Sequence, residues 1–295
     1  MNFSFSAYRS SKACIKNALV TNRLTSRGDK NMSHHFKETP ENAITQSGIA
    51  RVIPCKELDV GDPIKWLSLA LRDAMRAPGL TLFYGVLFAV IPWFIMYLVE
   101  MTGWHLVILP AIVCFMLVGP FLAAGLYDVS WEMEKGHKPT LRHSLRAMRR
   151  NAFNEWGFAI LLMVMMIFWL RVASLIHALY PPYIENDLES LLPFLALGTI
   201  VGAGFTLAML FITAFTQPIL MERKVDLATA VLTSVNAVWL NKVPMLIWGA
   251  IIFTTVAIGY VTGFIGFIVL MPIIGYASWH AYIDAIETKR ERKYE

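Results

Sequence analysis

Six long apolar segments, separated by shorter polar ones, follow one another along the chain after residue 79. Each is close to the roughly 20 residues that an α-helix needs to cross the hydrocarbon core of a bilayer. A helix satisfies all of its backbone hydrogen bonds within one segment, which the absence of water there requires. The pattern predicts an all-α polytopic membrane protein with six transmembrane helices, at about 80–99, 104–126, 153–179, 191–215, 243–261 and 264–283.

Two breaks between these segments, at 100–103 and 262–263, are only a few residues long. Helices joined by such short connections pack as antiparallel neighbours. The third segment stops at Tyr180-Pro181-Pro182-Tyr183, since proline lacks an N–H and disfavours α conformation in the residue before it. We therefore expect the six helices to form three hairpins.

A short helix-forming segment precedes each predicted hairpin. Asp62, Thr140 and Asp226 have side chains that cap helix N-termini, and apolar residues follow each of them at helical spacing. These segments predict three amphipathic helices, and each hairpin then carries an aromatic residue followed by glycine near its start. The recurrence predicts three parallel repeats, although caps and interfacial aromatic residues also recur in unrelated membrane proteins. The pairs are Tyr84-Gly85, Trp156-Gly157 and Trp248-Gly249.

The distribution of basic residues predicts the orientation. Of the 26 Lys and Arg residues, 12 precede the first span, 6 lie between the second and third, 3 between the fourth and fifth, and 4 follow the last. The connections after the first, third and fifth spans contain none. Because basic loops stay in the cytoplasm, we expect both termini and both longer loops there.

The two ends of the chain are polar. Residues 1–60 predict a disordered cytoplasmic tail, 61–285 the membrane domain, and 286–295 a basic cytoplasmic tail. Residues 1–31 are rich in Ser, Arg, Lys and Asn and lack the apolar core of a secretory signal. We expect translation to start at Met32. A mitochondrial-type transit segment and a disordered tail are alternative interpretations of residues 1–31.

Composition supports a membrane protein and gives no sign of a cofactor. The chain is 56% hydrophobic and 16% charged, which is too apolar for a typical soluble domain. Cys14, Cys55 and Cys114 show no metal-ligand spacing. Phosphate-binding, zinc-protease, serine-hydrolase and haem-attachment motifs are missing from the sequence. We expect a non-enzymatic protein without a metal or cofactor.

Arg171 is the one basic residue inside a predicted span. A charge within the membrane is costly and marks a candidate site, with Glu185, Asp187 or Glu189 within reach as partners. The alternative is that its long side chain extends to the interface and has no other role.

Tyr276, His280 and Asp284 are four residues apart and lie on one face of the sixth predicted helix. A histidine beside a carboxylate is a candidate proton relay or ligand site. The alternative is a belt of interfacial aromatic residues that contains one hydrogen-bonded histidine.

Four arginines lie in the loop before the third span, on the polar face of its predicted amphipathic helix. Anionic phospholipid headgroups attract such clusters by about 1 kcal/mol per basic residue. We expect these residues to contact lipid headgroups, and we expect no nucleic acid partner. They are Arg142, Arg146, Arg149 and Arg150.

Three motifs carry a resemblance to a known family: Val118-Gly119-Pro120-Phe121-Leu122-Ala123-Ala124-Gly125-Leu126-Tyr127, Ala230-Val231-Leu232-Thr233-Ser234-Val235 and Gly275-Tyr276-Ala277-Ser278-Trp279-His280-Ala281-Tyr282. Over about 52–285 the chain resembles the bacterial integral membrane proteins grouped as domain of unknown function 2189. Tyr276 stands where that family would have histidine. The resemblance implies an inner-membrane protein and no particular activity.

Three functions are compatible with these observations. The first is a non-enzymatic accessory or membrane-organising protein, whose partners are the lipid bilayer and another membrane protein or a second copy of the chain. The second is a carrier or channel for a small anionic or lipid-like solute, with Arg171 near its mouth. The third is an intramembrane enzyme that uses His280 and Asp284. The sequence favours them in that order.

Overall fold

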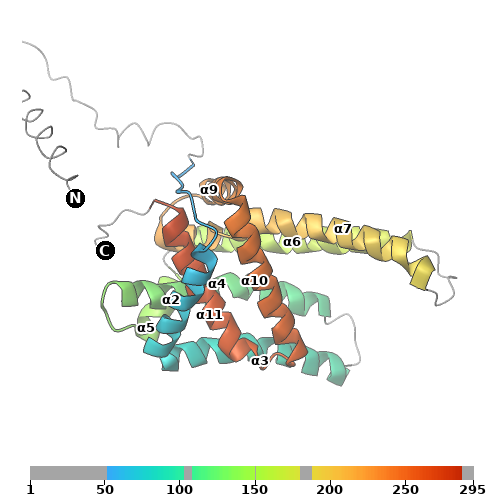
Figure 1. Ribbon diagram of the computed structural model, residues 1–295. Helices are drawn as coiled ribbons and strands as arrows, with labels where there is room; N and C mark the ends of the chain where they lie inside the picture. Colours follow the sequence, from blue (N-terminus) through green and yellow to red (C-terminus); the bar gives the residue numbers. More distant parts are fainter. Residues whose placement is uncertain (1–51, 103–107, 150, 180–187, 288–295) are drawn as a thin grey trace, which may run out of the picture. The chain divides into compact units, whose positions relative to one another are not determined.

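The computed structural model describes residues 52–102, 108–149, 151–179 and 188–287, and every regular element in these ranges is a helix (Figure 1). Residues 1–31 and the predicted basic tail from 288 onward lie outside them. The helices fall into three successive segments of the chain. The first contains α2 (Asp62–Arg76), α3 (Pro78–Thr102) and α4 (Ile108–Glu134); the second α5 (Leu141–Ala147), α6 (Ala152–Ala178), α7 (Leu188–Thr213) and α8 (Thr216–Glu222); the third α9 (Leu227–Leu240), α10 (Lys242–Val261) and α11 (Phe267–Ala285).

Four stretches of the described residues are helical, long and apolar enough to cross a membrane. They are Pro78–Leu98, Ala152–Ala178, Leu192–Glu222 and Lys242–Val261. They coincide with the first, third, fourth and fifth predicted spans, while α4 and α11 are helices at the places of the second and sixth. The chain is thus an all-helical protein with several segments suited to a bilayer.

The helix that opens each segment packs on another segment. In the second segment, α5 packs on α4 of the first, and in the third segment, α9 packs on α7 and α8 of the second. In the first segment, α2 packs on α11, the last helix of the chain. The second segment therefore packs on the first, the third on the second, and the first on the third, which closes a cycle. The beginning and the end of the described chain are in contact as a result.

The contact of α9 with the second segment shows how such a junction forms. The Ser234 hydroxyl donates to the Phe211 carbonyl oxygen at 2.8 Å and accepts from the Phe215 N–H at 3.1 Å. These backbone groups lie where α7 ends and α8 begins. Ser234 therefore satisfies two polar groups that the interruption of the helix leaves free in a buried place.

Residues 52–60 are part of this packing, although the sequence places them in the polar tail. The Lys56 N–H donates to the Ala285 carbonyl oxygen at 2.8 Å, and the Leu58 N–H donates to the Asn241 side chain at 2.8 Å. Ile286, at the start of the predicted C-terminal tail, is fully buried and forms a bridge with Cys55. Residues 52–60 and Ile286 therefore pack with the helices, although they lie outside the predicted bounds of the membrane domain.

Two of the three predicted helix starts are confirmed. Thr140 accepts from the His143 N–H at the start of α5, and Asp226 accepts from the Thr229 N–H at 3.0 Å at the start of α9. At α2 the prediction is off by one residue, because Gly61 is the N-cap and Asp62 lies inside the helix. The Asp62 carboxylate accepts from the Asp59 N–H instead.

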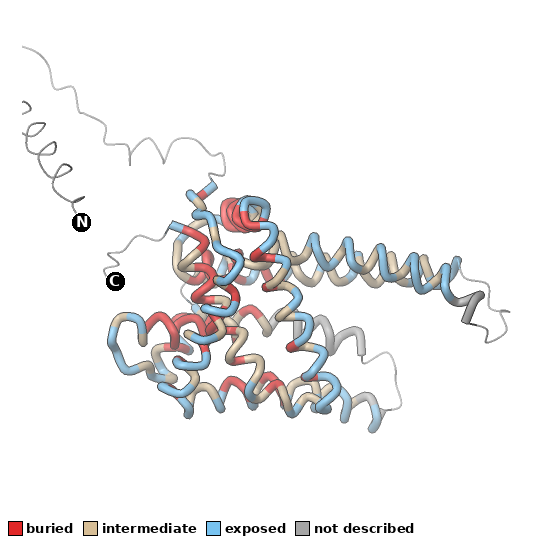
Figure 2. The backbone as a smooth tube through the Cα atoms, in the orientation of Figure 1, coloured by how far each residue is buried: buried red, intermediate tan, exposed pale blue. Residues whose placement is uncertain are grey.

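Buried residues gather at the junctions with the short helices, while the long helices expose apolar side chains (Figure 2). Trp66 of α2 and Trp248 of α10 are almost completely buried and pack edge to face, with ring centroids 5.6 Å apart. By contrast, α6 and α7 are mostly exposed or intermediate along their length. Large exposed apolar surfaces are what a bilayer-facing helix presents, because lipid replaces the protein core there.

We expect Asp226→Ala to lower the free energy of unfolding by about 1 kcal/mol, because the variant loses the cap of α9. Thermal unfolding in detergent, followed by tryptophan fluorescence, measures the change. Asp226→Asn is the matched control, because asparagine caps helices as well as aspartate does. Equal stability of the alanine variant and the wild type would contradict a capping role.

A comparison of the wild type with Asp226→Asn also tests a pH dependence. The hydrogen bond from the Thr229 hydroxyl lowers the pKa of Asp226 from its ordinary value. Folding thus favours the ionised form, so its stabilising contribution is present above the ordinary pKa and is lost as the pH falls through the lowered one. The stability difference between wild type and Asp226→Asn should shrink on acidification, and a constant difference would speak against this assignment.

Candidate functional site

A largely buried polar cluster surrounds His280. The imidazole of this α11 residue lies between two carboxylates from other helices. Its Nε2 is 2.8 Å from Asp73 Oδ2 of α2, and its Nδ1 is 3.5 Å from Glu134 Oε1 at the end of α4. The side chains of His280 and Asp73 are 10% and 7% exposed, whereas that of Glu134 is 35% exposed. The cluster thus joins three helices and reaches the surface at Glu134.

Two further side chains complete the cluster. The Ser130 hydroxyl of α4 donates to Asp73 Oδ2 at 2.5 Å, and the Trp279 indole N–H donates to Glu134 Oε2 at 3.3 Å. Ser130 and Trp279 are completely buried. Asp73 therefore accepts hydrogen bonds from both α4 and α11, which ties α2 to each of them.

The arrangement favours a doubly protonated imidazole. Each ring nitrogen of His280 faces a carboxylate oxygen, and both can donate only when the ring carries two protons. A buried carboxylate also needs a nearby positive charge, since isolated ions are costly to bury. The cluster can hold a proton and clamp three helices together.

Tyr276 and Asp284, which the sequence groups with His280, have different partners. The Tyr276 hydroxyl is 3.1 Å from the Thr81 hydroxyl of α3. The Asp284 carboxylate accepts from Lys65 at 2.8 Å and from the Trp66 indole at 3.0 Å. The hydrogen bond to Asp284 raises the pKa of the Lys65 ammonium group. Side chains spaced along one face of α11 therefore form hydrogen bonds with α2 and with α3.

Asp73 and Glu134, the carboxylates that contact His280, are absent from the residues singled out in the sequence. One signal points to Asp73: it shares a helical face with Trp66 and Ala70, and all three are buried. A charged residue on the buried face of an amphipathic helix indicates a buried polar partner. Glu134 gives no comparable signal, because it is the last residue of a long helix and stands next to other polar residues.

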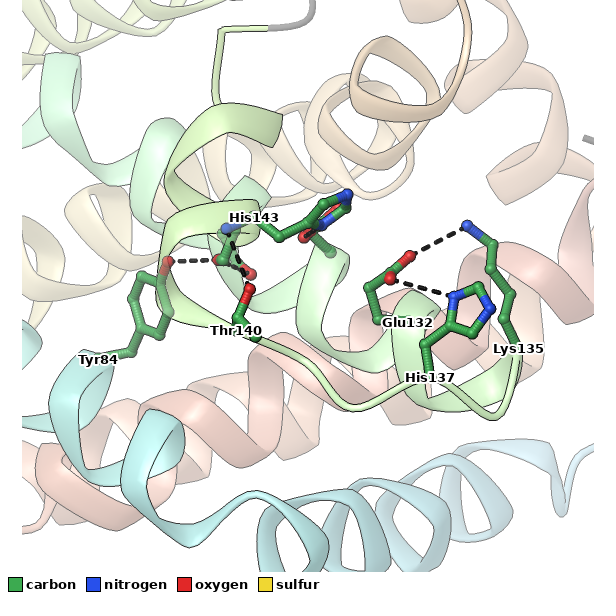
Figure 3. Close-up of polar contacts among 9 residues, drawn as sticks. Tyr84, Glu132, Lys135, His137, Thr140 and His143 are labelled. Atoms are coloured by element: carbon green, nitrogen blue, oxygen red, sulfur yellow. Dashed lines mark hydrogen bonds and ion pairs between the residues drawn. The ribbon is translucent and has the colours of Figure 1, made fainter. Parts of the chain in front are cut away.

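A second group of polar contacts holds α5 against α3 and α4 (Figure 3). The Ser144 hydroxyl is 2.5 Å from the Tyr84 hydroxyl and donates to the Gly125 carbonyl oxygen at 2.7 Å. His143 Nδ1 lies 2.7 Å from Asp128 Oδ2. A side chain at Gly125 would collide with Tyr84, since its Cβ would lie 2.3 Å from that hydroxyl. Close approach of α3 and α4 therefore requires glycine at position 125.

The turn between α4 and α5 has polar contacts of its own. Glu132 pairs with Lys135 and with His137, both at 3.3 Å (Figure 3). Lys135 also lies over the Trp131 ring, with its Nζ 3.4 Å from the ring centroid. These contacts fix the turn that leads from α4 into Thr140, so that α5 begins beside α4.

Three of the four arginines expected to contact lipid, Arg142, Arg146 and Arg149, are exposed around α5. Leu145 lies among them and is also exposed. The fourth, Arg150, is outside the described residues. An exposed leucine between arginines is typical of a helix at a membrane surface.

A second exposed surface of the same kind lies on α2, opposite its buried face. Its apolar members are Ile64, Leu71 and Met75, of which Ile64 and Met75 are 68% exposed. They follow helical spacing, and exposed basic residues stand beside them: Lys65, Arg72 and Arg76.

Arg171 is an exposed residue of α6. Among the side chains that the structure describes, none forms an ion pair with Arg171. The side chains of the acidic residues expected as its partners, Glu185, Asp187 and Glu189, are not among those described. The structure does not bring Arg171 together with His280, which belongs to the contacts of α11 with α2 and α4.

A cavity of about 360 Å³ lies among the three segments. The second helices of the segments, α4, α7–α8 and α11, each contribute to its wall. In each of the three, the residue before a proline lines the cavity: Gly119 before Pro120, Gln217 before Pro218 and Met271 before Pro272.

Within the described ranges, no group of three or more Asp, Glu, His or Cys side chains is placed to hold a metal ion. The helices, their exposed apolar surfaces and the buried junctions together define a helical integral membrane protein. Residues 108–222 match a family model described as "Predicted integral membrane protein (DUF2189)". This is the family that the sequence motifs predicted, and the match covers the middle part of the chain. The matched range begins with α4 and ends with α8. Neither the curated proteins nor the solved structures include a match to the chain.

Removing the Asp73 carboxylate should destabilise the protein strongly. In Asp73→Ala, Ser130 and His280 lose their common acceptor, and we expect a loss of about 3 kcal/mol in the free energy of unfolding. Lys65→Met is the control, because it breaks a mostly exposed ion pair that contributes at most about 1 kcal/mol. Thermal unfolding in detergent compares the two, and similar losses would contradict a clamping role for Asp73.

Proposed function

We propose that this protein is a non-enzymatic accessory or membrane-organising protein of the bacterial inner membrane. In this proposal it has six spans arranged as three hairpins, with both termini in the cytoplasm. The amphipathic helices α2, α5 and α9 lie at the cytoplasmic leaflet, where anionic phospholipid is their partner. Another membrane protein or a second copy of the chain is the further partner.

The observation that carries the proposal is the double-sided character of α2. Its buried face carries Trp66, Ala70 and Asp73, and bonds to α11 and α4. Its exposed face combines apolar residues with basic ones. A helix fixed to the protein by one face and amphipathic on the other suits a position between the protein and the headgroup region.

The hydrogen bonding within the His280 cluster supports a structural role over a catalytic one. Both imidazole nitrogens and Asp73 Oδ2 are already bonded to groups of the chain. A general acid or base must reach the substrate proton within hydrogen-bond distance. Here those positions are occupied by side chains that link helices, so the cluster serves as a clamp.

The lipid contact is tested by the triple variant Arg142→Gln, Arg146→Gln and Arg149→Gln. At about 1 kcal/mol per arginine, its affinity for anionic phospholipid should fall on the order of a hundredfold. Native mass spectrometry of the full chain, titrated with phosphatidylglycerol and with phosphatidylcholine, measures both affinities. Only the first should change.

The matched control replaces three exposed lysines elsewhere, Lys56, Lys224 and Lys242, by glutamine. It removes the same charge and should retain most of the phosphatidylglycerol affinity. Equal losses in the two triple variants would show that net charge alone attracts the lipid, and would remove the support for a binding surface at α5.

A second candidate function, a carrier or channel for a small anionic or lipid-like solute, is favoured by the cavity among the three segments. In that case Arg171→Gln should abolish uptake of small anions, with inorganic phosphate and acetate as probes in proteoliposomes. Arg72→Gln is the control, because Arg72 is an exposed arginine of α2. A folded Arg171→Gln protein with intact uptake would argue against this role.

A further inference from the structure

Gln217, a polar side chain in the wall of the cavity, has incomplete hydrogen bonding among the described residues. Gln217 lines the cavity and is only 4% exposed. Its Nε2 donates to the Pro120 carbonyl oxygen at 2.9 Å, so the amide orientation is fixed by that bond. Its Oε1 is buried and accepts no hydrogen bond from any described residue. A buried acceptor left in this way costs free energy unless a donor reaches it.

The remainder of the wall is mainly apolar. Phe88, Leu162, Met209 and Ile274 come from four different helices and line the space together with Gln217. The volume of about 360 Å³ lies in the range of pockets that hold small organic ligands. The wall thus suits a hydrocarbon body, and the unsatisfied Gln217 Oε1 suits a hydrogen-bond donor.

We propose that this cavity binds one membrane-soluble alcohol, with its hydrocarbon part against the apolar wall and its hydroxyl donating to Gln217 Oε1. Gln217 belongs to the candidate span Leu192–Glu222, so the ligand enters from the bilayer. An unsubstituted acyl chain fits the wall but leaves Gln217 Oε1 without a donor. A hydroxyl group satisfies both conditions at once.

This proposal does not depend on the proposed membrane-organising function. The surface arginines of α5 and the cavity involve different residues, so the triple arginine variant should bind the alcohol as the wild type does. Loss of phosphatidylglycerol affinity with retained alcohol binding, or the reverse, separates the two proposals.

The test compares 1-dodecanol with dodecane, which have the same chain and differ in the hydroxyl. We expect dodecanol at saturating concentration to raise the Tm of the detergent-solubilised full chain by about 3 °C or more, and dodecane to raise it much less. Equal shifts with the two compounds would overturn the role of the hydroxyl. No shift with either would overturn the binding site.

Two variants locate the effect. Gln217→Met removes the acceptor at similar size, and dodecanol should then stabilise the protein no more than dodecane does. Ala123→Phe fills the cavity and should abolish both shifts, while Ala250→Phe, at an exposed position of α10, should leave them unchanged. Persistence of the full dodecanol shift in Ala123→Phe would overturn the proposal.

Native mass spectrometry distinguishes the source of the ligand and does not require the variants to be as stable as the wild type. Protein released gently from its own membrane should retain a hydroxyl-bearing lipid that lacks a phosphate group in wild type and Ala250→Phe and lose it in Ala123→Phe. Preparations that retain no natural alcohol but bind added dodecanol with a single stoichiometry identify a free amphiphile as the source. Retention of a lipid without a hydroxyl in its place would refute the assignment.

Discussion

The structure depends on the packing of α2, α5 and α9, the helices that open the three segments, against the other segments. This packing closes into a cycle only because α2, near the start of the described chain, lies against α11 at its end. Asp73 and His280, 207 positions apart in the sequence, make the central bond of that closure. Neither helix alone can satisfy these buried groups, so association of the first and third segments is the condition for burying either one.

The polar junctions between helices and the exposed apolar surfaces have different roles in the structure. Between helices immersed in lipid, apolar contacts alone give little drive for association, because lipid tails are as apolar as the side chains. Specific hydrogen bonds, such as those of Ser144 and Ser234, and close approach at Gly125 provide the direction that apolar packing lacks. The long helices are then free to present apolar side chains outward, as α6 and α7 do.

Local features of the sequence predicted local features of the fold. The caps at Thr140 and Asp226 are confirmed because a cap depends on residues within one turn. The shared face of Tyr276, His280 and Asp284 follows from helical spacing, but their partners do not. Asp284 bonds to Lys65 and Trp66, while His280 bonds to Asp73 and Glu134. Sequence spacing within α11 carries no information about which other helices pack on it.

The sequence by itself determined the class of protein and its helical elements, because apolar length and helix-start signals are properties of contiguous residues. Only the tertiary structure decided which carboxylates surround His280, that residues 52–60 pack on α9 and α11, and that Gln217 lines a cavity with a buried acceptor. These properties arise from residues far apart in the chain. Their proximity is set by helix packing, which depends on the shapes of whole surfaces and leaves no periodic signal in the sequence.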